Sequence, residues 1–87
     1  MSGRQPVARL LIVDDEVPQM KALCSTLELE GYLTTGFSSP KQALAALKPD
    51  SFELLLTDLM MPEMDGIELL ACAREIDPNL LSIVMTG

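Results

Sequence analysis

The sequence predicts one α/β domain built on a parallel sheet, and three observations lead to this prediction. Three short apolar segments and one more polar segment alternate along the chain with three segments of helical periodicity. Two of the apolar segments run directly up to acidic residues, and capping residues, prolines and glycines stand at the element boundaries. Because a βαβαβαβ order implies parallel strands with right-handed crossovers, a doubly wound sheet is expected. With 87 residues and 48% hydrophobic content, the chain can form one folded core.

The first strand is predicted at residues 7–13, a continuous apolar run of the kind that is buried on both faces of a parallel sheet. Pro18 is well placed as the first residue of the first helix. The inward stripe of that helix follows the i, i+3, i+4, i+7 spacing: Met20, Leu23, Cys24 and Leu27. Gly31 is expected to end the helix in the left-handed conformation. Residues 33–37 form a more polar strand with an interior glycine, which favours a sheet edge.

The second helix is predicted to begin at Ser39, with Pro40 as its first residue and Gln42 completing a capping box. Its apolar stripe is narrow and consists of Ala43, Leu44 and Leu47. Pro49 terminates this helix because proline cannot continue it. The third strand is predicted at residues 52–56, shortly before Asp58.

The third helix is predicted to be capped by Asp65, with Glu68 at the third helical position, and to stop before Pro78. Its inward positions are expected at Ile67, Leu70, Ala73 and Ile76. The fourth strand covers residues 80–85 and ends at Thr86. In a sheet of order 2-1-3-4 the first helix covers one face and the other two cover the opposite face. Cys24 and Cys72 then lie across the sheet, too far apart for a disulfide.

Charge and composition exclude several functions. The net charge is −7, and all of it comes from residues 50–77, where eight acidic residues face Arg74 alone. This balance argues against nucleic acid or an anionic membrane as a direct partner. The absence of histidine excludes histidine-based catalysis and histidine metal ligands. Four of the acids in residues 50–77 are expected on a solvated face: Glu53, Glu68, Glu75 and Asp77.

Three strand ends are expected to converge on one site, because ligands of open α/β sheets bind outside the carboxyl ends of the strands. Asp14 and Asp15 follow the first strand, Asp58 follows the third and Thr86 follows the fourth. Neighbouring carboxylates repel one another unless a cation lies between them, and oxygen ligands select Mg²⁺ or Mn²⁺. The alternative for Asp14 is that it only caps the first helix. The three methionines near Asp58 are not expected to form a soft-metal site, since neither cysteine nor histidine accompanies them.

Three segments together resemble the receiver domain of two-component response regulators, a flavodoxin-like fold. They are Ile12-Val13-Asp14-Asp15-Glu16, then the run from Thr57-Asp58 to Met64-Asp65-Gly66, then Val84-Met85-Thr86-Gly87. The resemblance spans residues 7–87, with residues 1–6 as an N-terminal tail. It implies a further helix, a fifth strand and a fifth helix after Gly87, which carry a lysine of the phosphoryl site. The chain is therefore expected to be a receiver without its fifth βα portion.

The resemblance implies a phosphoacceptor switch rather than an enzyme, with at most slow self-dephosphorylation. Asp58 is the implied acceptor, and Thr86 the implied donor of a hydroxyl hydrogen bond to the phosphoryl group and the switch residue. Asp15, Asp58 and the backbone carbonyl of Met60 are implied ligands of Mg²⁺, with Asp14 acting through water. Backbone N–H groups just after Asp58 and Thr86 are expected as further donors. Pro62 and Gly66 are expected to shape the loop, with Gly66 allowing a tight turn.

The implied phosphoryl donor is a histidine kinase or phosphotransfer protein, with an output or kinase domain in the same chain or in a separate protein. We expect a cytoplasmic protein, because no segment is long enough for a membrane span and two cysteines suit a reducing compartment. Self-association is expected through the exposed edge of the fourth strand or through the output face. The main alternative function is a receiver-like interaction module that is not phosphorylated. An aspartate-nucleophile phosphatase is disfavoured because Met60 stands where its second acid is required, and no glycine-rich nucleotide loop is present.

Overall fold

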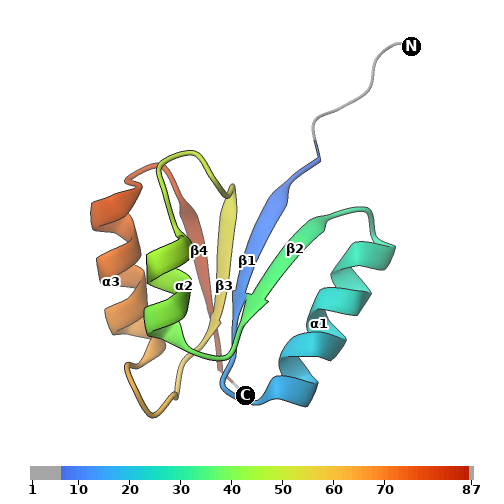
Figure 1. The fold of residues 1–87 in the computed structure, drawn as a ribbon, viewed down its shortest axis with the longest axis horizontal. Helices are drawn as coiled ribbons and strands as arrows, with labels where there is room; N and C mark the ends of the chain where they lie inside the picture. Colours follow the sequence, from blue (N-terminus) through green and yellow to red (C-terminus); the bar gives the residue numbers. More distant parts are fainter. Residues whose placement is uncertain (1–6, 87) are drawn as a thin grey trace.

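The computed structural model describes residues 7–86, and the predicted tail at residues 1–6 lies outside this range. Seven elements alternate along the chain: β1 (Arg9–Val13), α1 (Val17–Leu29), β2 (Leu33–Phe37), α2 (Pro40–Ala46), β3 (Leu54–Asp58), α3 (Gly66–Ile76) and β4 (Leu81–Met85). All strand pairs are parallel, and the order is β2-β1-β3-β4. In Figure 1, α1 covers one face of the sheet and α2 and α3 cover the other. The doubly wound α/β prediction and the strand order are confirmed.

The main core lies between the sheet and the pair α2 and α3. Its fully buried side chains come from both layers: Leu11, Val13, Ala43, Leu47, Leu55, Leu69, Ala73 and Leu80. On the opposite face, Leu10 and Ile12 are buried, yet the predicted inward stripe of α1 is only half-buried. Gly36 lies where α1 approaches β2 closely, since a Cβ there would overlap with the Met20 sulfur. The interior glycine of the edge strand therefore makes room for the helix.

The helix ends follow the capping residues of the sequence. Gly31 has a φ of 98°, and the N–H groups of Gly31 and Tyr32 donate to Glu28 and Leu27 at the end of α1. Asp65 and Glu68 form the predicted capping box of α3. The α2 box is only half present: Ser39 Oγ accepts the Gln42 N–H, but the reciprocal bond from the Ser39 N–H to the Gln42 side-chain oxygen does not form.

Several element predictions need correction. β1 begins at Arg9 instead of residue 7, β4 begins at Leu81 instead of residue 80, and α2 already ends at Ala46, before Pro49. β3 begins at Leu54 instead of residue 52, because its pairing starts where the Glu53 N–H donates to Arg9 O, and it runs on to Asp58, which pairs in register with Met85. The buried face of α3 is formed by Gly66, Leu69 and Ala73. Ile67 was predicted to point inward but is 57% exposed.

The carboxylate of Asp77 does not lie on a solvated face as predicted. The residue is only 3% exposed, and its two oxygens accept the N–H groups of Asp50 and Asn79, each at 3.1 Å. Asp77 therefore ties the loop before β3 to the loop before β4. Glu53 is partly exposed but forms an ion pair with Arg9.

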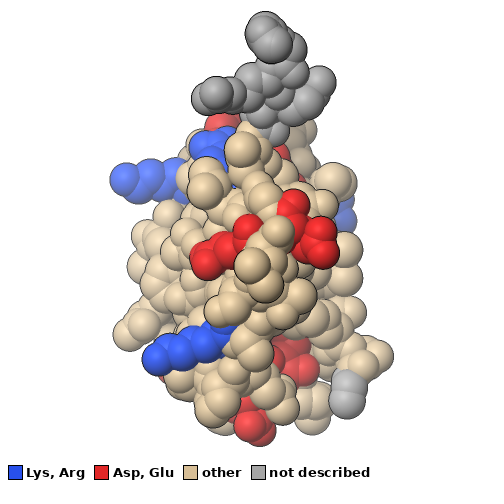
Figure 2. All heavy atoms as spheres, turned by 90° about the vertical axis from the view of Figure 1, so that its right-hand side faces the viewer, with Lys and Arg blue, Asp and Glu red and all other residues tan. Residues whose placement is uncertain are grey.

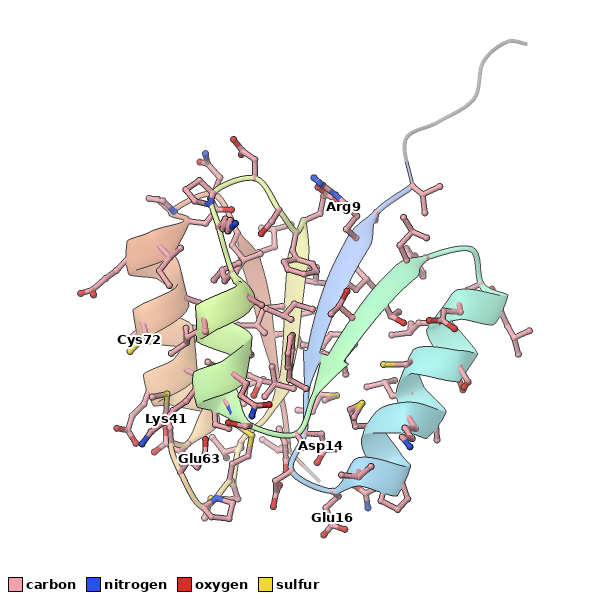
Figure 3. All side chains as sticks on the ribbon, in the orientation of Figure 1. Arg9, Asp14, Glu16, Lys41, Glu63 and Cys72 are labelled. Carbon is pink, nitrogen blue, oxygen red and sulfur yellow. The ribbon has the colours of Figure 1, made fainter. Side chains whose placement is uncertain are left out.

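Cys24 and Cys72 are both free thiols. Cys24 contacts the β2 side of the sheet from α1, whereas Cys72 lies on α3, on the opposite face (Figure 3). The prediction that they cannot pair is confirmed. Within residues 7–86, no helix has the length and apolar character needed to cross a membrane.

Candidate functional site

The carboxyl ends of the two central strands bring three aspartates together. β1 ends at Val13, directly before Asp14 and Asp15, and Asp58 is the last residue of β3. Since β1 and β3 are hydrogen-bonded neighbours with Val13 opposite Thr57, these ends lie side by side. One carboxylate oxygen from each of the three aspartates lies within 4.8 Å of the other two. The predicted convergence of Asp14, Asp15 and Asp58 is therefore confirmed.

Asp14 is 6% exposed, and both its backbone N–H and its side-chain carboxylate are hydrogen-bonded within the protein. Its N–H donates to Phe37 O at 3.1 Å, and its Oδ1 accepts the Glu16 N–H at 2.9 Å. Glu16 is the N-cap residue of α1, but its own side chain makes no capping hydrogen bond. The helix-capping alternative thus accounts for one oxygen of Asp14, and it leaves Asp15 and Asp58 unexplained.

The Asp58 carboxylate is oriented by the backbone that follows it. Its Oδ1 accepts the Leu59 N–H at 2.9 Å, and the same N–H lies 3.1 Å from Met85 O of β4. The N–H just after Asp58, expected as a donor to a bound group, is therefore already engaged within the protein. No hydrogen bond from residues 7–86 reaches the second oxygen, Oδ2.

A cavity of about 560 Å³ opens over the acidic cluster. Its lining comprises Asp14, Asp15, Glu16, Gln19, Leu23, Asp58, Met60 and Met85. Figure 3 shows Asp14 and Glu16 at the sheet end where β1 enters α1. Thr86 follows directly after β4 and is exposed, but it is not part of this lining.

Gln19, Leu23 and Met85 line the cavity and were not predicted as site residues. The sequence could have indicated two of them, because Leu23 belongs to the predicted apolar stripe of α1 and Gln19 lies one turn earlier on the same helix face. Met85 could be found only from its place at the end of β4. These residues give the acidic cavity a partly apolar wall.

Gly66 fixes the approach of α3 to the site. A Cβ at this position would lie 2.5 Å from Asp58 O and 3.1 Å from Leu59 Cα, and the Gly66 N–H donates to Leu59 O at 2.7 Å. Its φ is not positive, so close backbone contact, rather than the predicted tight turn, requires glycine here. This contact also explains why the buried face of α3 starts at Gly66 instead of Ile67.

The charge around the site suits a cation. Among residues 7–86, no lysine or arginine lines the cavity, and the ionisable side chains that do line it are all acids. Figure 2 shows the side of the molecule that carries α1, where acidic groups occur at several heights and basic groups are scattered rather than clustered. The donor set consists of carboxylate oxygens, which match the preference of Mg²⁺ or Mn²⁺.

Fold and site together define a class: a doubly wound α/β protein with an oxygen-ligand acidic centre at the carboxyl edge of its sheet. The family model of the response regulator receiver domain matches residues 10–87. The chain belongs to this family, and it is a flavodoxin-like receiver domain of two-component response regulators. Its acidic cavity is consistent with a phosphoacceptor signalling switch.

Individual relatives agree with the family assignment. The response regulator receiver protein CpdR of Brucella abortus is 44% identical over 79 residues, which cover 91% of this chain and 66% of CpdR. The transcriptional regulatory protein FixJ of Rhizobium meliloti is 42% identical over 77 residues, which cover 87% of this chain and 37% of FixJ. A crystal structure of a CheY-like receiver domain from Methanospirillum hungatei superposes with a TM-score of 0.87 at 34% identity, covering 94% of this chain and 66% of that one. The chain thus spans less than two thirds of these relatives.

Family membership carries general properties. Receiver domains are regulatory, bind Mg²⁺ at an acidic pocket and work with histidine kinases or phosphotransfer proteins. This chain has an acidic cluster of that kind, formed by Asp14, Asp15 and Asp58.

Proposed function

We propose that this domain accepts a phosphoryl group on Asp58 from a phosphohistidine of a histidine kinase or phosphotransfer protein. The observation that carries the proposal is the position of the Asp58 carboxylate, which ends a central strand, faces a cavity and lies within 4.8 Å of two further aspartates. The hydrogen bond from the Leu59 N–H orients Asp58 through Oδ1. We place residues 7–87 in this receiver unit, after a tail at residues 1–6.

The residues fit a divalent ion. Asp15, Asp58 and the backbone carbonyl of Met60 would hold Mg²⁺ directly, and Asp14 would do so through a water, since its Oδ1 is engaged by the Glu16 N–H. When bound, Mg²⁺ neutralises part of the charge between the anionic carboxylate and the anionic phosphoryl group.

The transfer step follows from the chemistry of the two side chains. A carboxylate oxygen of Asp58 attacks phosphorus, the phosphorus–nitrogen bond of the donor breaks, and the imidazole leaves with the bonding electrons and is then protonated. The product is an acyl phosphate. Thr86 would donate its hydroxyl to a phosphoryl oxygen, which requires movement, because Thr86 does not line the cavity. This movement would be the switch that an output or kinase domain detects.

The cellular setting is part of the same proposal. The two free cysteines on opposite faces suit the reducing cytoplasm. The output or kinase domain would lie in the same chain or in a separate protein.

Incubation with acetyl phosphate and Mg²⁺, followed by intact mass spectrometry, tests the proposal. We expect a single phosphoryl adduct that is labile to base, is absent after chelation of Mg²⁺ and is absent in Asp58→Asn. An otherwise identical Asp65→Asn variant is the matched control, because Asp65 caps α3 and does not line the cavity. A folded protein without any adduct, also when a phosphorylated histidine kinase is the donor, would favour the unphosphorylated interaction module instead.

A further inference from the structure

The segment between β3 and α3 is held at its start by backbone contacts. It begins at Leu59, whose N–H contacts Asp58 Oδ1 and Met85 O and whose carbonyl accepts the Gly66 N–H. Met60, whose carbonyl is the proposed metal ligand, comes next, and its side chain is 74% exposed. Within residues 7–86, no backbone hydrogen bond reaches Met60, so the position of its carbonyl depends on how the segment is held on either side.

Glu63 provides a second point of attachment, on a different element. Its Oε1 accepts the Ser39 hydroxyl at 2.8 Å and lies 3.4 Å from the Lys41 backbone nitrogen. Ser39 and Lys41 belong to the start of α2, which lies 22 to 24 residues earlier in the chain. Figure 3 shows Glu63 and Lys41 close together at the end of α2 nearest the site.

The start of α2 lacks part of its own capping interactions. Pro40 has no N–H, Ser39 Oγ takes the Gln42 N–H, and the reciprocal half of the predicted capping box is missing. The first turn of α2 contains no acidic residue of its own. Glu63 supplies both an acceptor for the Lys41 N–H and the negative charge that a helix N-terminus favours.

We propose that Glu63 is a positioning residue of the phosphoryl site: by attaching the loop to α2, it fixes the Met60 carbonyl for the divalent ion. This inference rests on the proposed function for the identity of the metal ligands. The residue does not touch the cavity itself, so it acts only through the backbone between Leu59 and Glu63. Residues that orient metal ligands typically change metal affinity by about 10- to 100-fold when they are removed.

Binding of Mn²⁺ alone, measured as free Mn²⁺ by electron paramagnetic resonance, tests this role without any phosphorylation. We expect Glu63→Ala to weaken binding about tenfold. Glu63→Asp keeps the charge but shortens the side chain by one methylene, and it is expected to weaken binding as well. Glu63→Gln retains an acceptor and should recover most of the affinity. The matched control is Glu75→Ala, which removes one exposed acid of α3 whose carboxylate forms no ion pair within residues 7–86.

Thermal unfolding of the same variants separates positioning from stability. A lower unfolding midpoint with Mn²⁺ affinity within twofold of the wild type, in Glu63→Ala or Glu63→Asp, would overturn the proposal. If wild-type protein binds Mn²⁺ and Glu63→Ala weakens it, but no phosphoryl adduct forms, then the proposed function fails and the positioning role stands. If the wild type binds no Mn²⁺, both fail.

Discussion

Met60 lies at the cavity, two residues after Asp58, and most of its side chain is exposed. A thioether cannot orient a water molecule for attack on an acyl phosphate, because it is at most a weak acceptor. We therefore expect slow loss of phosphate in the wild type and faster loss in Met60→Asn and Met60→Glu, by about tenfold, since placed polar groups can contribute more than this. Met60→Leu should decay like the wild type. The decay of the intact-mass adduct after removal of the phosphodonor measures all four rates, and equal rates would contradict the expectation.

Gly66 couples the start of α3 to the backbone of Asp58. An added Cβ would meet backbone atoms, which cannot move aside as a flexible side chain can. We expect Gly66→Ala to lower the free energy of unfolding by about 1–3 kcal/mol and to slow phosphorylation of Asp58. Gly31→Ala is the matched control. A Cβ at Gly31 would meet no other atom, but the φ there is positive, so backbone strain alone should lower the free energy of unfolding by about 1–2 kcal/mol. Chemical denaturation and the phosphorylation rate distinguish the two, and a normal rate in Gly66→Ala would contradict the coupling.

A small number of polar contacts join elements of this fold, and one of them is the exposed Arg9–Glu53 ion pair, whose side chains are 44% and 45% exposed. Arg9 opens β1 and Glu53 directly precedes β3. The Glu53 carboxylate accepts both the backbone N–H and the guanidinium of Arg9, and Arg9 also donates to Asp50 O at 2.8 Å. This pair lies at the end of the sheet opposite the acidic cavity, as the position of Arg9 in Figure 3 shows.

The pair makes stability depend on pH in a defined direction. The hydrogen bond from Arg9 holds the pKa of Glu53 below its ordinary value of 4.5. The folded state therefore binds the Glu53 proton less readily than the unfolded state does. The pair contributes fully to the free energy of unfolding above about pH 4.5, and this contribution is lost as the pH falls through the lower pKa of Glu53 in the folded state. We expect the difference in denaturation midpoint between wild type and Glu53→Gln to be largest at neutral pH and to shrink below about pH 4.5. A constant difference for Glu53→Gln across this pH range would contradict the assignment.

Elements were predictable where the sequence itself determines local geometry. Gly31 and Asp65 fixed the end of α1 and the start of α3, and both are confirmed. The start of β3 and the inward face of α3 were wrong because they depend on pairing with Arg9 and on contact with the Asp58 backbone, which are long-range. Asp77 was mistaken for a solvated acid for the same reason, since both of its donors lie on loop backbones.

At the scale of the whole molecule, the site was predictable because a parallel sheet collects its strand ends at one edge. The carboxylates of Asp14, Asp15 and Asp58 meet there as expected, and Met60 lines the same cavity. Gln19 and Met85 were missed because a cavity wall depends on how α1 and β4 pack around the acids, and neither residue is chemically distinctive. The contact of Glu63 with α2 could not be predicted for a related reason. The sequence pattern at the start of α2 indicated a complete local capping box, whereas in the structure Glu63 takes the place of half of it.

The outer edge of β4 is the second whole-molecule feature. Within residues 7–86, β4 pairs only with β3. Leu81 N–H and Met85 O face β3, so the backbone groups of Ser82 and Val84 face outward. Residues 78–87 carry no charge, although charges are a common protection of edge strands. Leu81 and Ile83 are 69% and 50% exposed on the sheet face that α1 only partly covers.

We expect this edge to make the 87-residue chain self-associate. An antiparallel pair of β4 strands centred on Ile83 would place Ser82 of one copy opposite Val84 of the other, without opposing like charges and with apolar side chains joined across the contact. Ile83→Lys should convert the associated species to monomer, because a lysine there would face its own copy across the pair. Ile67→Lys is the matched control, since Ile67 is similarly exposed but lies on α3. Sedimentation equilibrium over a range of concentrations measures the effect. A wild-type chain that stays monomeric and unfolds cooperatively would show that this edge is inert despite its free backbone groups.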